Sequence, residues 1–401
     1  MKIIFMGTPD FSVGTLEALV EAGHEVVLAV TQPDKPKGRG KEMQFTPVKE
    51  CALAHNIPVY QPKKIREPEC IEELKKYQAD VCVVVAFGQI LPKEILEMTP
   101  YGCINVHASL LPKYRGAAPI QWAVINGEKV SGVTTMQMDE GLDTGDMLEK
   151  VEITLDKKET GGSLFDKLSA KGAALCVHTL AELEKGTITP QKQGESTTEY
   201  AKMLNKKSGE IDWTKTAVEI ERLIRGLNPW PSAYTFYNGK TLKIWDADVL
   251  EEAVPTDAVP GQVLQADKHG FTVAAGEGIL KINELQLEGK KRMAADAAGY
   301  VAPPECAEST GKNIAVVGGG PGGLSAAYFL QLMGHQVTVY EMLPKLGGML
   351  RYGIPNYRLP KERLDDDIQA ILDTGVKVDC GKAIGKDYSI VDLKEKYDAV
   401  L

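Results

Sequence analysis

Two residues of this chain combine a reactive type with a suggestive spacing, Asn105 and His107. They follow a short apolar stretch at residues 102–104, which predicts extended chain at this point. Because side chains alternate along a strand, the amide and the imidazole are expected to lie on the same face. Both can donate hydrogen bonds to one oxygen and could stabilise negative charge that develops on a carbonyl oxygen. Taken alone, the pattern is more typical of a capped turn with a hydrogen-bonded histidine. The choice between this turn and a catalytic pair therefore depends on the rest of the chain.

A parallel α/β sheet is the scaffold that would position this pair. The first strand, helix and second strand occupy about thirty residues, which is the length of a βαβ unit. The expected strands are 2–7, 25–30, 58–61, 80–87, 131–138 and 147–155, and the expected helices are 15–20, 48–55, 69–77, 118–126 and 163–183. The first turn, Gly7-Thr8-Pro9, lacks the later glycines of a dinucleotide fingerprint, so this unit is expected to be scaffold.

Two connecting segments stand out from this pattern. Residues 139–146 form an acidic, glycine-punctuated turn that contains Asp143, and its carboxylates are locally typical of turn formers. Residues 31–49 form a long loop in which proline and glycine exclude a helix. The basic residues of this loop are Lys35, Lys37, Arg39 and Lys41. The loop is either a solvated surface loop or a mobile arm that contacts phosphates.

Composition restricts the class of protein. A length of 401 residues fits two to four domains, and a net charge of -9 provides no global basic surface, so nucleic acid would have to contact local patches. The seven cysteines are scattered without a Cys-x-x-Cys pair, which argues against a disulfide scaffold or a zinc site. No stretch approaches the roughly 18 apolar residues of a membrane span, and the N-terminus does not resemble a signal peptide. We expect a cytoplasmic protein without a metal site.

The second half of the chain contains two further domains. Residues 191–210 are polar and are expected to be a linker. A helix at 216–226 and strands at 233–237, 241–247, 261–264, 270–274 and 278–287 then predict a small β-barrel, of the open five-stranded kind. Residues 294–311, rich in alanine and proline, mark the next boundary.

A glycine motif follows this boundary. The strand at 313–317 leads into Gly318, Gly320 and Gly323, a helix and a second strand, which ends at Glu341. Strand, G-x-G-x-x-G, helix and a following acidic residue make up the full context of a dinucleotide-binding fingerprint. The sequence ends within an expected strand, so we expect this βαβ unit to be part of a domain.

Six motifs of residues 1 to about 293 resemble the methionyl-tRNA formyltransferase family, in family order. They are Gly7-Thr8-Pro9-Asp10-Phe11, the Gln32–Lys41 loop, Asn105 to Gly116, Gly141 to Asp146, Ile211-Asp212-Trp213, and Arg225 to Pro231. The resemblance implies a Rossmann-like formyltransferase domain at 1–190 and an OB-like barrel at 211–293 that helps to hold tRNA. It also implies transfer of a formyl group from 10-formyltetrahydrofolate to the α-amine of initiator methionyl-tRNA.

Site residues follow from the same resemblance. The catalytic set of the wider folate-dependent formyltransferases falls on Asn105, His107 and Asp143, with Asp143 favouring the protonated histidine and ordering a water. The folate site would be lined by Ser109, Leu110, Leu111, Pro112, Phe87, Gly88 and Gln89. The tRNA contacts would come from Lys35, Lys37, Arg39, Lys41, Lys206 and Lys207. We expect the enzyme to act as a monomer.

Residues of about 301–401 resemble the start of the flavin domain in the glutamate synthase small-subunit group. The matching residues are the glycine motif, Glu341 and the run Leu346 to Pro355. The resemblance implies a partial FAD-binding unit at 312–401, with Gly318, Gly320, Gly323 and Glu341 at the cofactor. The iron–sulfur cysteines and the NADPH half of that group are absent from this sequence, so redox catalysis is not expected.

Two alternative functions remain open from the sequence. One is a formyltransferase that acts on a UDP-linked amino sugar, since such enzymes also occur fused to nucleotide-binding domains. The basic loop and the Asn228-Pro229-Trp230-Pro231 segment favour tRNA instead. The other is an inactive tRNA-binding fusion, which the presence of Asn105, His107 and Asp143 disfavours.

Overall fold

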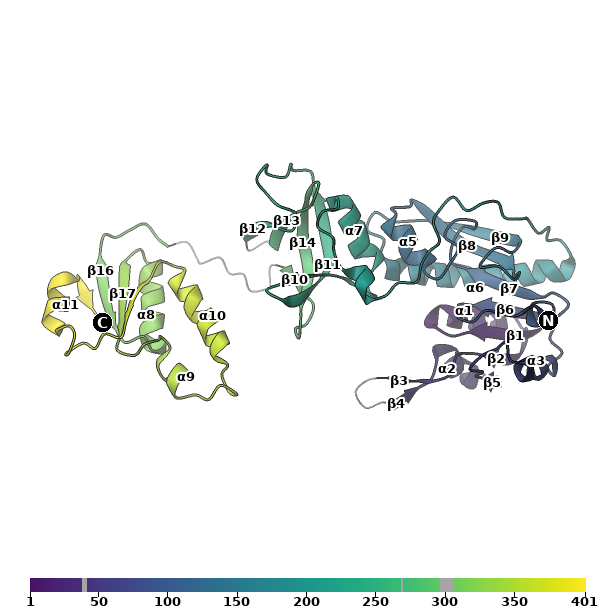
Figure 1. The fold of residues 1–401 in the computed structure, drawn as a ribbon, viewed down its shortest axis with the longest axis horizontal. Coiled ribbons are helices and arrows are strands. Elements are labelled where there is room, and N and C mark those ends of the chain that lie inside the picture. Colours follow the sequence, from purple (N-terminus) through teal and green to yellow (C-terminus); the bar gives the residue numbers. More distant parts are fainter. Residues whose placement is uncertain (38–41, 268–269, 296–305) are drawn as a thin grey trace. The chain divides into compact units, whose positions relative to one another are not determined.

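The computed structural model describes residues 1–37, 42–267, 270–295 and 306–401 (Figure 1). The chain divides into two compact units, residues 1–265 with 269–298 and residues 266–268 with 299–401. Each unit has a hydrophobic core of its own. Two of the predicted tRNA contacts, Arg39 and Lys41, lie outside the described residues.

The first unit begins with a seven-stranded sheet in the order β5-β2-β1-β6-β7-β8-β9. The first five strands of this order are parallel, whereas β8 and β9 run antiparallel to their neighbours. The strands are β1 (Lys2–Gly7), β2 (Glu25–Val30), β5 (Val59–Tyr60), β6 (Val81–Val85), β7 (Cys103–His107), β8 (Val130–Gln137) and β9 (Met147–Thr154). The helices are α1 (Asp10–Glu21), α2 (Pro47–Ala54), α3 (Pro68–Lys75), α4 (Lys93–Leu96), α5 (Pro119–Ile125) and α6 (Gly161–Lys185).

Helices cover both faces of this sheet. In β1, Ile3 and Phe5 pack in the core shared with α1 and α6, whereas Ile4 and Met6 pack in the core shared with α3 and α4. The alternation follows from the two-residue period of a strand. Burial of one such side chain contributes about 1.5–3 kcal/mol to the stability of the fold. Because both faces of β1 are buried in this way, the two cores fix the position of the strand in the sheet.

Local capping sets the limits of α6. The Thr160 hydroxyl accepts a hydrogen bond from the Ser163 backbone N–H at 3.0 Å, and the Ser163 hydroxyl accepts one from the Thr160 N–H at 2.9 Å. The helix ends at Lys185, and its C-cap residue Gly186 has a left-handed φ of 69°. The reciprocal cap satisfies two helix-end donors, and such a cap contributes about 1 kcal/mol.

The long basic loop contains a short hairpin of β3 (Lys35–Lys37) and β4 (Glu42–Gln44). The prediction that proline and glycine exclude a helix is consistent with this hairpin. The strands themselves were not predicted, because proline in a short run argues against a strand. Pro36 is tolerated here because a two-stranded ribbon has only edge strands.

A second, antiparallel sheet follows in the same unit, in the order β10-β11-β14-β13-β12, with β15 paired to β14. Its strands are β10 (Ala233–Tyr237), β11 (Lys240–Leu250), β12 (Val263–Asp267), β13 (Gly270–Ala274), β14 (Ile279–Leu287) and β15 (Met293–Ala294). The short 3-10 helix η1 (Lys206–Gly209) and helix α7 (Ala217–Gly226) precede it. Ile220 and Ile224 of α7 pack against Ile244 and Ile282 of the sheet, which anchors the helix on one face.

The second unit has a parallel four-stranded sheet in the order β18-β17-β16-β19. The strands are β16 (Asn313–Val317), β17 (Gln336–Glu341), β18 (Lys377–Cys380) and β19 (Ala399–Val400). The helices are α8 (Pro321–Leu332), α9 (Gly348–Tyr352), α10 (Lys361–Leu372) and α11 (Ile390–Lys396). The predicted βαβ unit is therefore β16-α8-β17, with the glycine motif between β16 and α8.

The predicted fold class, an α/β domain followed by a small β domain and a Rossmann-type βαβ unit, is confirmed. The predicted element bounds are mostly one to three residues off, since helix and strand ends fray and carry weak sequence signals. None of the helices in the described ranges combines the length and the apolar character that crossing a membrane requires.

Candidate active site

The C-terminal end of β7 carries Asn105 and His107, between β6 and β8. Asn105 pairs with Val84 on one side and Met136 on the other, and His107 pairs with Thr134. The intervening Val106 packs into the core on the opposite face, as the alternation of a strand predicts. Asn105 is 8% exposed and His107 is 6% exposed, so both side chains lie in a largely water-excluded setting.

The side chain of Asn105 is largely buried, and the described residues leave its hydrogen-bonding capacity unused. Among the described residues, no hydrogen-bond partner is found for its side chain, although Asn105 is only 8% exposed. Within the described residues, the buried side-chain nitrogen that lacks a partner is Nε1 of Trp245, so the polar atoms of the Asn105 amide remain accessible. The amide therefore has two N–H groups available for a ligand.

The His107 ring is held from both sides. Its Nε2 lies 3.0 Å from the Tyr114 carbonyl oxygen, and its Nδ1 lies 3.8 Å from Oδ1 of Asp143. Because a carbonyl oxygen only accepts, Nε2 carries the hydrogen in this contact. Nδ1 is then the ring nitrogen that faces the Asp143 carboxylate.

Asp143 is presented by the acidic turn between β8 and β9. Its Oδ2 accepts a hydrogen bond from the Gly116 backbone N–H at 2.9 Å, and its φ of 55° lies in the left-handed region. Tyr114 also has a left-handed φ, of 54°. Such conformations are uncommon for residues other than glycine and cluster at functional sites. In the same turn, a Cβ at Gly145 would lie 1.8 Å from the Gln137 carbonyl oxygen, so no larger residue fits there.

Tyr114 links this site to the surface beyond it. Its hydroxyl donates to Oε1 of Glu128 at 2.9 Å and accepts from Nδ2 of Asn126 at 3.1 Å. Burial raises the pKa of Tyr114 to about 12, and the Glu128 carboxylate adds to this effect. The phenol therefore stays protonated at neutral pH and fixes the loop whose carbonyl holds His107.

The predicted folate residues lie in two turns. Ser109 donates to the Lys113 carbonyl oxygen at 2.6 Å and Leu111 is buried beside Met136, whereas Leu110 and Pro112 are partly exposed. The other turn has Phe87 buried, Gly88 exposed and Gln89 partly buried. The Gln89 amide oxygen accepts from the Ile65 N–H at 2.7 Å, so this side chain fixes the neighbouring segment. The structure brings Ser109 and Leu111 close to Thr134 of β8.

The predicted tRNA contacts fall on two segments of the first unit. Lys35 is exposed on β3, and Lys37 ends that strand. Lys206 and Lys207 are exposed on η1.

Sequence reasoning did not identify Gln193 and Arg115 as part of this site. The Gln193 amide contacts the acidic turn and the guanidinium of Arg115. No periodic pattern marks either residue, and Gln193 lies in the segment that was expected to be a linker.

The glycine motif of the second unit fits a dinucleotide. Gly318 has a φ of 109°, and a Cβ at Gly323 would lie 1.8 Å from the Gly318 carbonyl oxygen. The turn enters the N-terminus of α8, where free backbone N–H groups attract phosphate. Glu341 is 6% exposed, and its carboxylate accepts from the N–H groups of Gly319 at 2.6 Å and Leu343 at 2.8 Å. The acidic residue thus lies directly beside the turn, as the fingerprint requires.

An α/β sheet with Asn105 and His107 at one strand end, Asp143 on a neighbouring turn and an antiparallel domain later in the chain together define a two-domain formyltransferase. Residues 1–180 match the family described as formyl transferase, and residues 203–300 match the formyl transferase C-terminal domain. Residues 316–377 match the NAD(P)-binding Rossmann-like domain.

The chain belongs to the methionyl-tRNA formyltransferase family. It is 65% identical to the methionyl-tRNA formyltransferase of Agathobacter rectalis over 295 residues, which are 73% of this chain and 94% of that protein. The corresponding protein of Lachnospira eligens is 62% identical over 296 residues, again 73% of this chain and 94% of the relative. A solved structure of WlaRD, a sugar 3N-formyl transferase in the presence of dTDP and 5-N-formyl-THF, shares the fold at 21% identity. Its TM-score is 0.53, with 73% of this chain and 99% of that one covered.

Proposed function

We propose that residues 1–293 transfer the formyl group of 10-formyltetrahydrofolate to the α-amine of initiator methionyl-tRNA. Membership of the methionyl-tRNA formyltransferase family supports this reaction. The observation that carries the proposal is the unpartnered Asn105 amide beside His107, whose Nδ1 faces Asp143 at 3.8 Å.

In the proposed first step, the lone pair of the α-amine forms a bond to the formyl carbon, and the carbonyl π electrons move to the formyl oxygen. Asn105 donates a hydrogen bond to this oxyanion. His107 donates from Nδ1 in its imidazolium form, because Nε2 is already engaged by the Tyr114 carbonyl. Two preorganised donors in a buried setting stabilise the tetrahedral adduct more than water would.

In the proposed second step, the oxyanion re-forms the carbonyl as the bond from the formyl carbon to N10 of the folate breaks, and N10 keeps the bonding electrons. N10 gains one proton, and the attacking nitrogen loses one. We assign Asp143 to ordering the water that carries this proton, because the Gly116 N–H holds one carboxylate oxygen and leaves the other toward His107. The atoms and electrons of these two steps balance without a covalent intermediate on the enzyme.

Substrate contacts complete the proposal. The folate lies against Ser109, Leu110, Leu111, Pro112, Phe87, Gly88 and Gln89, and the tRNA contacts Lys35, Lys37, Arg39, Lys41, Lys206 and Lys207. We assign residues 1–190 to catalysis and 211–293 to holding tRNA, in a monomer that works in the cytoplasm. The exposed position of Lys35, Lys206 and Lys207 supports the tRNA assignment.

Substitution of Asn105 tests the proposed catalytic role. In Asn105→Ala we expect turnover to fall by about 10²–10³, the usual loss for one oxyanion donor. Asn105→Asp keeps the size but removes both N–H donors, so it should show a similar loss. Formylation of charged initiator tRNA is measured for folded, purified variants. Turnover within threefold of the parent would contradict the oxyanion role.

Substrate competition separates the alternatives. The parent protein is assayed with initiator methionyl-tRNA, elongator methionyl-tRNA and a UDP-linked amino sugar. The proposal predicts turnover with the initiator substrate. Preferred turnover of the sugar nucleotide would replace the proposal with the sugar formyltransferase alternative. Binding of initiator tRNA without turnover would indicate an inactive fusion.

For the second unit we propose binding of FAD, as in the flavin domain of the glutamate synthase small-subunit group. The tight turn at Gly318 and Gly323 beside Glu341 favours a dinucleotide there. The run from Leu346 to Pro355 resembles the flavin domain of that group, which supports a flavin enzyme rather than a sugar dehydrogenase. FAD would supply redox chemistry when bound, but we assign this unit only its binding.

A further inference from the structure

Residues 191–202 follow the rim of the candidate active site. Gln191 and Met147 exchange two backbone hydrogen bonds of 2.8 Å, which attach the start of the segment to β9. Further along, the Thr198 hydroxyl accepts from the Tyr114 N–H at 2.7 Å. A segment that would otherwise be a polar connection is therefore bonded to β9 and to Tyr114, whose carbonyl oxygen contacts His107. We call residues 191–202 the strap.

Gln193 makes the most directed contacts of the strap. Its Nε2 donates to the carbonyl oxygens of Asp143 at 2.9 Å and Gly145 at 2.7 Å. Its Oε1 accepts from Nε of Arg115 at 3.0 Å and from a terminal nitrogen of the same guanidinium at 2.8 Å. A guanidinium has only donors, so it requires the amide oxygen on its side. Arg115 thereby turns the amide N–H groups toward the two carbonyls.

These contacts close a ring of interactions around the proposed catalytic pair. His107 contacts the carbonyl oxygen of Tyr114, and Arg115 is the next residue in the chain. Arg115 donates a hydrogen bond to the Gln193 amide, which in turn donates one to the backbone carbonyl of Asp143. Asp143 then faces His107 at 3.8 Å. The backbone of Asp143 has a left-handed φ of 55°, which costs energy unless neighbouring contacts enforce it. Two hydrogen bonds from one amide, to the carbonyl oxygens of Asp143 itself and of Gly145, supply contacts that hold this part of the turn.

We propose that Gln193, oriented by Arg115, is a positioning residue for the formyl transfer described under the proposed function, on which this inference rests. It touches no reacting atom. It fixes the acidic turn so that the Asp143 carboxylate keeps its distance and direction to His107. A displacement of about 1 Å in such a group can lower a rate by roughly 10²-fold.

Gln193→Glu is the sharpest perturbation of this contact. The carboxylate keeps the acceptors that Arg115 needs, but it has no hydrogen to donate and faces two carbonyl oxygens. We expect kcat to fall by about 10- to 100-fold, with KM for both substrates within about threefold. Gln191→Glu is the matched control, because it makes the same change two residues away on an exposed side chain. Equal kcat values for the two variants would overturn the proposal.

A double substitution distinguishes positioning from general destabilisation. In the Asp143→Asn background, Gln193→Glu should lower kcat by less than about threefold further, because the group through which it acts is already lost. The same factor in both backgrounds would overturn the proposal. If Gln193→Glu does not fold, Gln193→Met removes the hydrogen bonds at similar length and is judged by the same two comparisons.

Amide hydrogen exchange gives a readout that does not depend on activity. Residues 139–146 should exchange faster in Gln193→Glu than in Gln191→Glu, and equal rates would overturn the proposal. Absence of formylation by the parent would instead refute the proposed function. The two failures are therefore distinguishable.

Discussion

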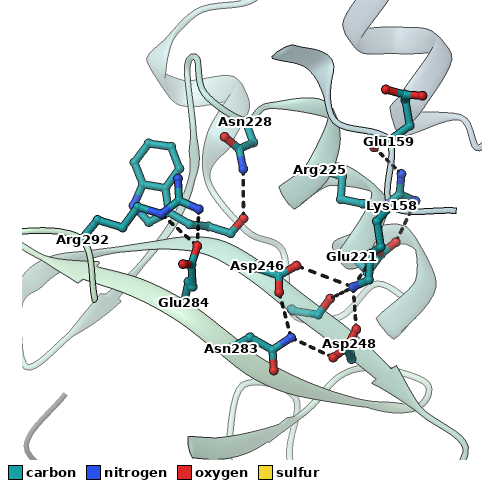
Figure 2. Close-up of polar contacts among 12 residues, drawn as sticks. Lys158, Glu159, Glu221, Arg225, Asn228, Asp246, Asp248, Asn283, Glu284 and Arg292 are labelled. Atoms are coloured by element: carbon teal, nitrogen blue, oxygen red, sulfur yellow. Dashed lines mark hydrogen bonds and ion pairs between the residues drawn. The ribbon is translucent and has the colours of Figure 1, made fainter. Parts of the chain in front are cut away.

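Replacement of Lys158 tests what joins the catalytic domain to the antiparallel domain in the first unit. Figure 2 shows the Lys158 amine among carboxylates of the antiparallel domain, Asp246 and Asp248 on β11 and Glu221 on α7. The amine donates to Asp248 at 2.5 Å and to the Ala247 carbonyl oxygen at 2.8 Å, with Asp246 at 3.6 Å and Glu221 at 3.9 Å. We call these residues the Lys158 cluster.

Neighbouring donors limit the size of the effect. Asn283 donates to Asp246 at 2.9 Å and to Asp248 at 2.8 Å, and Arg225 donates to Glu221. These contacts remain when the lysine is replaced. The Lys158 and Asp248 side chains are each 46% exposed, so solvent screens the pair. Exposed ion pairs contribute about 0.2–1 kcal/mol each, and three carboxylates share this cation, which gives about 1–2 kcal/mol in total.

The assay uses Lys158→Met, which keeps the length of the apolar stem and removes the charge. Urea unfolding is followed by tryptophan fluorescence, because all four tryptophans lie within residues 1–298 and none in 299–401. We expect the free energy of unfolding to fall by about 1–2 kcal/mol at low salt. At 1 M salt the Debye length is about 3 Å, so the difference should fall by about half.

Lys157→Met is the matched control, because Lys157 is the exposed neighbour of Lys158 in the same loop. It should change the free energy of unfolding by less than about 0.5 kcal/mol. Equal losses in the two variants would show that the cluster has no specific role. A loss in Lys158→Met that is independent of salt would show that packing of the stem, rather than charge, stabilises the contact.

Two further predictions concern titration and the second unit. The hydrogen bond from Lys158, followed by that from Asn283, holds the pKa of Asp248 below its ordinary value of 3.8. Because the folded state has the lower pKa, the stabilisation by the ionised Asp248 is fully present above pH 3.8 and is lost as the pH falls through the folded-state pKa. The difference in the free energy of unfolding between the parent and Lys158→Met should therefore shrink only under those acidic conditions. Urea unfolding as a function of pH measures this difference, and a difference that stays constant in strong acid would contradict the prediction. In the second unit, FAD added to the purified chain should remain bound through gel filtration, as read by absorbance. The Glu341→Ala variant should lose the FAD. A chain that retains NADP but not FAD would refute the flavin assignment.

The sequence predicted most of the first sheet because its elements follow simple periods. Ile3 to Met6 alternate between two cores, and the predicted strand bounds agree with β1 and β2. It also predicted the residues at the end of β7, since a strand with Asn105 and His107 two apart must present both on one face. The proximity of Asp143 to His107 came from the resemblance alone, because residues 36 apart are brought together only by the β7–β8 pairing.

The hairpin in the basic loop was not predicted. Pro36 and the nearby glycines are signals for irregular chain, and the pairing of Pro36 with Met43 depends on a partner strand that is only three residues long. Short strands contribute little to a periodic pattern. Such elements form because tertiary context supplies the missing stability, which a local reading of sequence does not contain.

The strap shows why a site is harder to predict than a sheet. His107 and Asp143 interact through their side chains, so the resemblance could assign both from the residue types in its motifs. Gln193 instead binds the backbone carbonyls of Asp143 and Gly145, and every residue has a carbonyl. Nothing in the sequence of the acidic turn therefore points to a glutamine about fifty positions away. Polar segments such as residues 191–202 are assigned to linkers because their side chains do not form a core, yet hydrogen bonds to backbone are how such segments become ordered. The positions that orient a catalytic group can consequently lie in the segments that composition marks as least structured.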